Sequence, residues 1–429
     1  MNIIIDSTRS LEDLLRDLEQ AVAQREQALA ATIERTILQR LFMADMQRDE
    51  IERQARALMQ ELAQACAVVP TPPSPAPPKA PAPGGFSFET ELSTKTLPVA
   101  QGNGAVYPVW FGTNRQPDLQ GGFSGERGEG IRRGRVDVFV PDAHKFGETG
   151  SSLFKRLTRW DFRDDTLRVQ KVTTQERDTF FTTLRETMQR ARDKGDTPDA
   201  LIFIHGFNTS FEEAAVRSAQ IGVDLGVLPG ASGFFSWPSK GDIKGYPADE
   251  ASIEASERAI ADFLVDFSAN CGARKVHLLA HSMGNRGLLR ALQRIAADVQ
   301  AQGKVKFGQI FLAAPDLDRD LFLDLAHLYP AHSERTTLYA SDADLPVHLS
   351  SKLHDAPRAG YFQPYTVAPK IDTVCVPDFD IDMLGHGYFA QAEALLYDIG
   401  ELLRTNASPP RQRIVPVTEG GHDFWRIKR

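Results

Sequence analysis

The stretch Val276–Asn285 reads VHLLAHSMGN, and its pattern decides the fold class. A short, mostly apolar run leads into Ser282, with Ala280 two positions before it and Gly284 two positions after it. Such a run is typical of a buried strand, and the residues after the serine read as a helix. The turn of a nucleophile elbow is so tight that both flanking positions must be very small. The stretch therefore predicts such an elbow, with Ser282 as the nucleophile.

The segments around this stretch repeat the order strand, helix, strand. Short apolar runs predict strands at 107–111, 136–140, 167–172, 200–205, 233–236, 276–280, 309–313, 336–340 and 373–376. Helices are predicted at 175–194, 211–222, 250–271, 283–297, 320–327 and 388–403. This alternation predicts an α/β fold, in which a mostly parallel sheet has helices on both faces.

A second motif, Ile204–Asn208 (IHGFN), directly follows a predicted strand. In an α/β hydrolase the loop after the third strand often carries an HG dipeptide that turns a backbone amide toward a developing oxyanion. The amides of Phe207 and Met283 are therefore the predicted oxyanion hole. We expect His205 to brace this loop by hydrogen bonding rather than to transfer protons.

A serine hydroxyl needs a general base, and the base needs an acid that orients it. Among the histidines after Ser282, His386 follows the last predicted strand of the α/β segment and precedes the final helix, in LGHGYF. This position in the topology favours His386 as the base. For the acid we favour Asp344, after the strand 336–340, and leave Asp342 and Asp316 as open alternatives.

Two further residues are candidates for substrate binding. Arg115, in FGTNR, is able to bind a carboxylate or phosphate, but an arginine at this place also satisfies loop carbonyls. Trp237, in SWPS, either walls an acyl pocket or packs between sheet and helix. Both interpretations stay open for each residue.

Composition excludes several classes of protein. The chain has 429 residues, 42% of them hydrophobic, and a formal net charge of -8, which is ordinary for a globular protein and offers no basic field for nucleic acid. Its 3 cysteines are scattered, without the spacing of a zinc site, and we expect neither a metal nor an organic cofactor. No secretory leader or transmembrane segment is evident, so we expect a cytoplasmic protein.

The predicted domains are a long helix at 1–68, a linker at 69–86, the α/β domain at 87–405 and a tail at 406–429. The region 11–65 has neither glycine nor proline and carries a broken apolar stripe, which predicts a long, coiled-coil-like helix. The following tract is rich in proline and alanine and separates this helix from the domain. We therefore expect self-association or a protein partner through residues 11–65.

The α/β part of the chain resembles a bacterial α/β-hydrolase family, domain of unknown function 900, in the esterase and lipase superfamily. The motifs that carry the resemblance are FGTNR (111–115), FIHGFN (203–208), SWPS (236–239), AHSMGN (280–285), APD (314–316), YAS (339–341) and LGH (384–386). The resemblance implies an α/β-hydrolase fold with a serine nucleophile, preceded here by the long helix.

The predicted activity is cleavage of a small-molecule or lipid-like carboxylic ester or thioester through an acyl-enzyme, by Ser282, His386 and Asp344. An amidase or peptidase on the same fold is a further option. A different class of function remains open, in which the domain is a binding module and the N-terminal helix oligomerises or recruits a partner.

Overall fold

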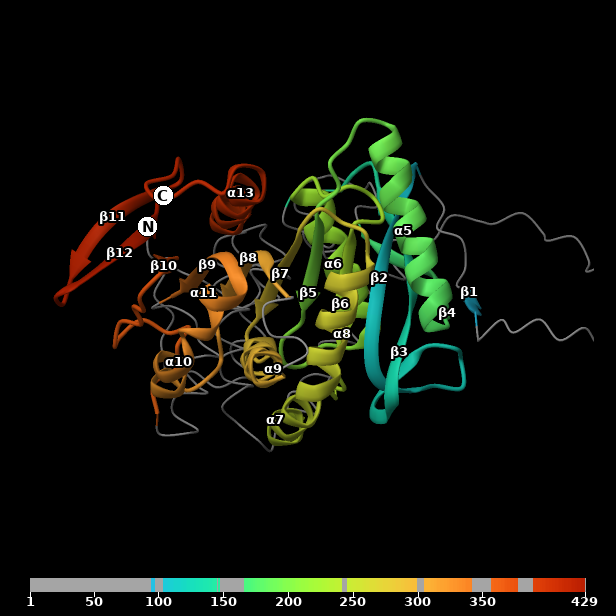
Figure 1. Ribbon diagram of the computed structural model, residues 1–429, viewed down its shortest axis with the longest axis horizontal. Helices are drawn as coiled ribbons and strands as arrows, with labels where there is room; N and C mark the ends of the chain where they lie inside the picture. Colours follow the sequence, from blue (N-terminus) through green and yellow to red (C-terminus); the bar gives the residue numbers. More distant parts are fainter. Residues whose placement is uncertain are drawn as a thin grey trace, which may run out of the picture. The chain divides into compact units, whose positions relative to one another are not determined.

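The fold is that of a computed structural model of the chain (Figure 1). It describes residues 103–144, 146, 166–240, 245–298, 305–341, 356–376 and 394–428, with the backbone of 389–393 and of the short strand β1, Thr94–Thr96. The predicted helix at 1–68, the linker at 69–86, Asp342, Asp344 and His386 all lie outside these residues.

The described residues form a 12-stranded sheet with the order β1-β4-β3-β2-β6-β5-β7-β8-β9-β10-β12-β11. After β1 the strands are β2 (Gly104–Pro117), β3 (Phe123–Pro141), β4 (Arg168–Gln175), β5 (Ala200–Ile204), β6 (Ser232–Ser236), β7 (Val276–His281), β8 (Phe307–Ala313), β9 (Ser333–Ala340), β10 (Ile371–Cys375), β11 (Ile414–Glu419) and β12 (His422–Ile427). The helices are α5 (Arg177–Asp193), α6 (Phe211–Asp224), α7 (Tyr246–Ala255), α8 (Glu257–Asn270), α9 (Gly284–Ala297), α10 (Arg319–Leu325), α11 (Leu328–His332) and α13 (Phe389–Thr405). From β2 through β12 the neighbouring strands of this order are parallel, so their carboxyl ends share one edge of the sheet.

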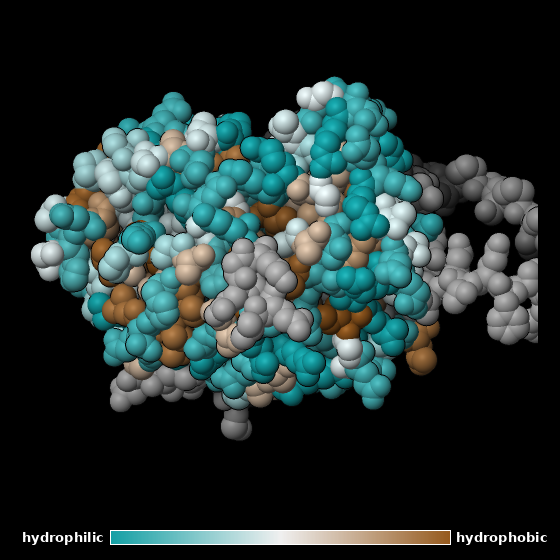
Figure 2. All heavy atoms as spheres, viewed as in Figure 1, coloured by the Kyte–Doolittle hydropathy of each residue, from teal (hydrophilic) through white to brown (hydrophobic). Residues whose placement is uncertain are grey.

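Helices cover both faces of this sheet, as the sequence predicts. Ile202 and Ile204 of β5 pack with α5, α8 and α9 on one face, whereas Leu201 and Phe203 pack with α6 and α13 on the other. Because successive side chains of a strand point to opposite faces, a strand buried on both sides needs an unbroken apolar run. The face seen in Figure 2 is mainly hydrophilic, with smaller hydrophobic areas between, as is usual for a surface.

Strands β2 and β3 form a long antiparallel hairpin whose register shifts opposite Arg115. Thr113 pairs with Arg132 and Arg115 pairs with Arg127, so an advance of two residues in β2 (115 − 113) opposes five in β3 (132 − 127). β3 passes close to the backbone of Arg115, because a Cβ on Gly128 would lie 2.6 Å from the Arg115 carbonyl oxygen, and the Ser124 carbonyl of β3 accepts from the guanidinium at 3.2 Å. The hairpin thus encloses Arg115 at the edge of the sheet where the parallel strands end.

The single helix predicted at 250–271 is wrong, because the chain breaks at Ser256 between α7 and α8. The Ser256 hydroxyl donates to the Ser252 carbonyl at 2.7 Å and accepts from Asn114 Nδ2 at 2.9 Å. A serine that bonds backbone four residues earlier competes with helix continuation and favours a bend. The contact from β2 holds this bend in place, which the periodicity of the helix does not reveal.

The tail predicted at 406–429 is in fact part of the sheet. β11 and β12 form a hairpin, and β12 pairs in parallel with β10 through Val374 and Trp425 (Figure 1). The turn is Gly420–Gly421, with φ of 59° and 77°, the left-handed conformation that glycine adopts without strain. Phe424 is 3% exposed and packs on Tyr365 and Phe362. The sheet therefore extends past 405.

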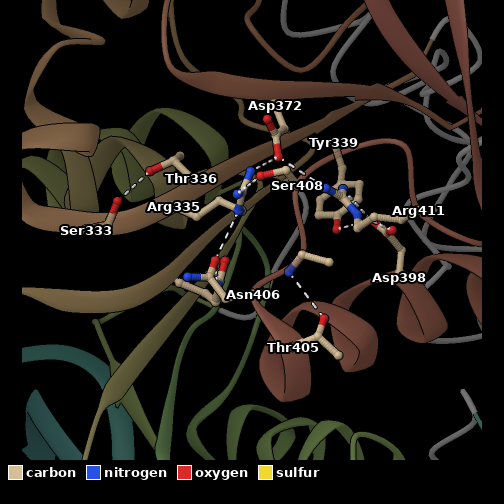
Figure 3. Close-up of polar contacts among 12 residues, drawn as sticks. Ser333, Arg335, Thr336, Tyr339, Asp372, Asp398, Thr405, Asn406, Ser408 and Arg411 are labelled. Carbon is tan, nitrogen blue, oxygen red and sulfur yellow. Dashed lines mark hydrogen bonds and ion pairs between the residues drawn. The ribbon is translucent and has the colours of Figure 1, made fainter.

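A buried ionic network fastens this C-terminal segment to the sheet (Figure 3). Arg411 donates to both carboxylate oxygens of Asp398, at 2.7 and 2.9 Å, and neither side chain has solvent exposure. The Tyr339 hydroxyl donates to Asp398 at 2.7 Å, and Asp372 accepts from Arg411 at 3.1 Å. A bidentate, fully paired carboxylate is the arrangement in which a buried charge is tolerated. The network ties α13 to β9 and β10.

Candidate active site

Ser282 lies on the turn between β7 and α9, at the carboxyl edge of the parallel strands. Its φ is 48°, a left-handed conformation that is strained for a serine and that costs roughly 1–3 kcal/mol unless the surroundings impose it. The surroundings do impose it. The Ser282 amide donates to the Ala313 carbonyl of β8 at 2.9 Å, and Asn285 Nδ2 donates to the carbonyls of Ala280, Ser282 and Ala313 at 3.0–3.3 Å.

Two glycines let the elbow and the loop after β5 come into close contact. A Cβ on Gly284 would lie 2.5 Å from the His205 carbonyl oxygen, and one on Gly206 would lie 3.0 Å from Ser282 Cβ. Neither distance leaves room for a methyl group, which explains why glycine stands at both places. The pairing of Ile204 with Ala280 in β5 and β7 brings these segments side by side. The predicted elbow and the predicted oxyanion loop therefore do meet in space.

The loop after β5 is held along its length by buried side chains. His205 Nδ1 contacts the Gly206 carbonyl oxygen at 2.8 Å, and the Thr209 hydroxyl donates to the Phe207 carbonyl at 3.1 Å. The imidazole is buried, and burial together with the charge of Arg115 lowers the pKa of His205 to about 3. A histidine that stays neutral and donates to the backbone braces the loop, which is the role expected from the sequence.

The predicted oxyanion amides are those of Phe207 and Met283. Within the part of the chain that the structure describes, neither amide has a hydrogen-bond acceptor. An unpaired backbone amide is uncommon in a closely packed region, because nearly all buried amides are paired. These two donors, unpaired among the described residues, lie on either side of the close contact between the loop and the elbow. Fixed donors beside a serine are what an oxyanion hole would require.

The far end of the same loop is anchored on Asp249, which the sequence did not single out. This carboxylate is fully buried and accepts from the Ser239 hydroxyl at 2.6 Å and the Lys240 amide at 2.8 Å. Ser239 Oγ in turn accepts from the Thr209 amide at 3.1 Å. Burial raises the pKa of Asp249, and the nearby charge of Arg115 opposes that rise.

Arg115 is placed inside the protein and not toward a substrate. It is 1% exposed, and its guanidinium donates to Ser236 Oγ and to the carbonyls of Ser239, Thr209 and Ser124 at 2.7–3.2 Å. A guanidinium has five N–H donors, and these contacts engage both sides of its fork. The predicted substrate-binding role is therefore corrected: Arg115 satisfies loop carbonyls.

Trp237 is likewise corrected, because it has no exposed surface with which to wall a pocket. Its indole Nε1 donates to the His205 carbonyl at 2.8 Å, and its ring stacks on the His205 imidazole with centroids 5.0 Å apart. Trp237 therefore packs against the loop that follows β5. Its contribution to a site is to fix the orientation of the His205 ring, on which it stacks.

The predicted base His386 and the predicted acid Asp344 lie outside the described residues. The strands that precede them in sequence, β9 and β10, end at Ala340 and Cys375, at the edge that carries Ser282. The acid alternative Asp316 is described. Its amide donates to the Ser282 carbonyl at 3.2 Å, and its carboxylate accepts from the Tyr246 hydroxyl at 2.7 Å and contacts Arg286 at 3.4 Å.

Other features of the site were not evident from sequence. Asn285 follows the elbow motif directly, and an amide three residues after the nucleophile is a signal that it bonds the turn. Tyr246 packs its ring on Phe207 with centroids 5.2 Å apart and so links the oxyanion loop to Asp316. No group of three or more His, Cys, Asp or Glu side chains in the described ranges is arranged to hold a metal ion. No described helix is long and apolar enough to cross a bilayer.

A mostly parallel sheet with a strained serine after its central strand, and an HG loop on the neighbouring strand, defines an α/β-hydrolase fold. The family of alpha/beta hydrolases of unknown function, DUF900, matches residues 181–404, which is more than half of the chain. The chain belongs to this family, as its motifs predicted.

Solved structures also resemble the chain. A Xanthomonas campestris protein described as an α/β serine hydrolase without lid is 14% identical, with a TM-score of 0.32, and the match covers 73% of this chain and 100% of that one. A Pyrobaculum calidifontis esterase is 13% identical, with a TM-score of 0.30, over 70% of this chain and 85% of that one. At such identities these structures say nothing about activity. No curated protein is similar enough to count as a relative.

Proposed function

We propose that the protein is a serine hydrolase that cleaves a carboxylic ester or thioester of a small or lipid-like molecule through an acyl-enzyme. The observation that carries this proposal is the strained Ser282, held at φ 48° beside two amides that have no acceptor among the described residues. A strained serine on the turn between a strand and a helix is the conformation of a nucleophile elbow, which presents the hydroxyl from the turn.

In the proposed mechanism the Ser282 hydroxyl attacks the ester carbonyl while His386 takes its proton. Asp344 holds the imidazole in the tautomer that accepts this proton. The oxyanion of the tetrahedral intermediate accepts hydrogen bonds from the Phe207 and Met283 amides. Collapse expels the alcohol or thiol, which receives the proton from His386, and leaves an acyl group on Ser282. Water, deprotonated by His386, then releases the acid and regenerates the enzyme.

The geometry supports fixed donors over donors that rearrange. The oxyanion loop is bonded at His205, Phe207 and Thr209, and the elbow is bonded by Asn285. Donors that need not reorganise during the reaction account for much of the rate enhancement of such enzymes, and each contributes roughly 100- to 1,000-fold. Most of the chemistry is therefore assigned to preorganised backbone.

The test is labelling of the purified full chain with a fluorophosphonate, with the modified peptide mapped by mass spectrometry. We expect modification at Ser282, no labelling in Ser282→Ala, and a loss of ester hydrolysis on the order of 10⁶-fold in both Ser282→Ala and His386→Ala. Ser218→Ala is the matched control, because it also removes a buried serine hydroxyl, one on α6 that donates to the Gly233 carbonyl of β6 at 3.2 Å.

The acid is resolved by comparing Asp344→Asn with Asp342→Asn and Asp316→Asn in the same assay. We expect the large loss only in the first. A folded wild-type protein that neither labels at Ser282 nor hydrolyses esters would refute the proposal and favour a binding role. Faster cleavage of amides than of matched esters would instead place the chain among amidases or peptidases.

A further inference from the structure

Three buried side chains form one line of hydrogen bonds that ends on the oxyanion loop. Arg115 Nε lies 2.8 Å from Ser236 Oγ, which lies 3.2 Å from His205 Nε2. On the other side of the ring, Nδ1 lies 2.8 Å from the Gly206 carbonyl oxygen. The three residues are at most 1% exposed and come from β2, from β6 and from the residue that follows β5.

The directions of the hydrogen bonds in this line follow from its carbonyl end. A guanidinium only donates, so Ser236 Oγ accepts from Arg115 and still has its own hydrogen to donate. A carbonyl only accepts, so His205 Nδ1 must carry the hydrogen that it donates to Gly206. In the neutral ring this leaves Nε2 as an acceptor, so the Ser236 hydroxyl donates to it, and the bond from Arg115 is compatible with that direction.

The Gly206 carbonyl in turn fixes the amide of Phe207, because the two belong to one peptide plane. In a trans peptide the C=O and the following N–H point in opposite directions. Holding the oxygen on His205 therefore aims the N–H away from the ring. The Thr209 hydroxyl, which donates to the Phe207 carbonyl at 3.1 Å, fixes the next plane as well.

We propose that Arg115 and Ser236 are positioning residues that hold His205 in the Nδ1–H tautomer, so that His205 locks the Gly206–Phe207 peptide with its amide directed as an oxyanion donor. The inference rests on the proposed function for the identity of that donor. In this proposal the FGTNR, SWPS and HG motifs together orient the Phe207 amide, and Arg115 has no contact with the substrate.

The first test reads the tautomer and does not depend on activity. A two-bond proton–nitrogen correlation spectrum of the full chain near neutral pH distinguishes Nδ1–H, Nε2–H and the charged ring, and the signal missing in His205→Asn assigns the residue. We expect a neutral Nδ1–H ring in the wild type. An Nε2–H or charged ring at His205 would overturn the proposal, whether or not the protein is a hydrolase.

The second test uses two replacements that keep different halves of the imidazole. The amide nitrogen of asparagine falls near the place of Nδ1, whereas that of glutamine falls near Nε2. We expect His205→Asn to retain labelling at Ser282 within roughly 10-fold, and His205→Gln to lose roughly 100-fold in labelling rate and kcat with little change in KM. A merely structural histidine would not separate these two variants, so equal losses would overturn the proposal.

The third test removes the link between the arginine and the ring. We expect Ser236→Ala to lower the labelling rate roughly 10-fold, while the matched Ser218→Ala keeps the wild-type rate. A Ser236→Ala protein that labels as fast as the wild type would contradict the proposal. Wild-type protein that is not labelled at Ser282 would refute the proposed function instead, and the tautomer would still be measurable.

Discussion

Replacing Gly284 with alanine should damage both the stability and the activity of the protein. The new Cβ would lie 2.5 Å from the His205 carbonyl oxygen and 2.7 Å from that of Ile204, and both atoms are backbone. Ordinary contact begins near 3.4 Å, so the loop or the helix must move by about 0.9 Å (3.4 − 2.5). The displaced segment is the one that carries the Phe207 amide.

The expected size of the effect follows from this displacement. Overpacking of this kind costs about 1–3 kcal/mol, which outweighs the roughly 1 kcal/mol that alanine gains over glycine in a helix. A misplacement of about 1 Å lowers the rate of a positioned reaction roughly 100-fold. Helix propensity alone predicts that alanine raises stability, so the sign of the change in unfolding free energy distinguishes overpacking from propensity.

The assay is urea unfolding together with the rate of fluorophosphonate labelling. Gly400→Ala in α13 is the matched control, because there the new Cβ would meet the flexible end of Arg404 at 3.2 Å and no backbone. We expect the control to gain a few tenths to 1 kcal/mol and to label normally. If Gly284→Ala is as stable as wild type and labels at the same rate, the close approach of loop and elbow is not what constrains this position.

Three further outcomes can be measured by urea unfolding. Burial lowers the pKa of His281 from 6.5 to about 4, so the unfolded chain binds a proton in that window and the native state does not. The contribution of His281 to the unfolding free energy is fully present above pH 6.5 and should fall by on the order of 3 kcal/mol toward pH 4. His281→Gln should flatten this dependence of stability on pH, and an unchanged dependence would contradict the assignment. Asp398→Ala removes the bidentate partner of the buried Arg411, which keeps only its contact with Asp372, and should cost about 3–5 kcal/mol. Lys275→Ala, at a side chain that is 31% exposed, should cost less than about 1 kcal/mol. Phe424→Ala should cost about 3 kcal/mol if the C-terminal hairpin belongs to the domain, and nothing measurable if it is a tail.

The sequence predicts those parts of the site in which a reactive residue type stands at a backbone position that itself has a sequence signature. Ser282 and the HG dipeptide both follow continuous apolar runs, and parallel strands buried on two faces require such runs. Small residues at Ala280, Gly284 and Gly206 then report the tight turn and the close contact. The order of the strands and loops along the chain then predicts that the two motifs meet, because the loops after parallel strands lie at one edge of the sheet.

The orientation of polar side chains could not be read in the same way. The FGTNR motif is compatible with either a substrate contact or a loop brace for Arg115, because a sequence motif does not say which carbonyls lie within reach. Asp249 is on a helix that begins after the loop it anchors, so nothing in its neighbourhood marks it. The hairpin of β11 and β12 was missed since its edge strand is mostly exposed, although the pair Gly420–Gly421 is a hairpin signal.

The uneven pairing of β2 and β3 determines where this chain tolerates changes of length. Phe111, Thr113 and Arg115 are every second residue of β2. One inserted or deleted residue between them would therefore turn the guanidinium to the opposite face of the sheet. The tip of the hairpin carries no such constraint, since Leu119 is fully exposed there. Insertions in natural variants should therefore gather at residues 118–122, while the spacing from Phe111 to Arg115 is kept.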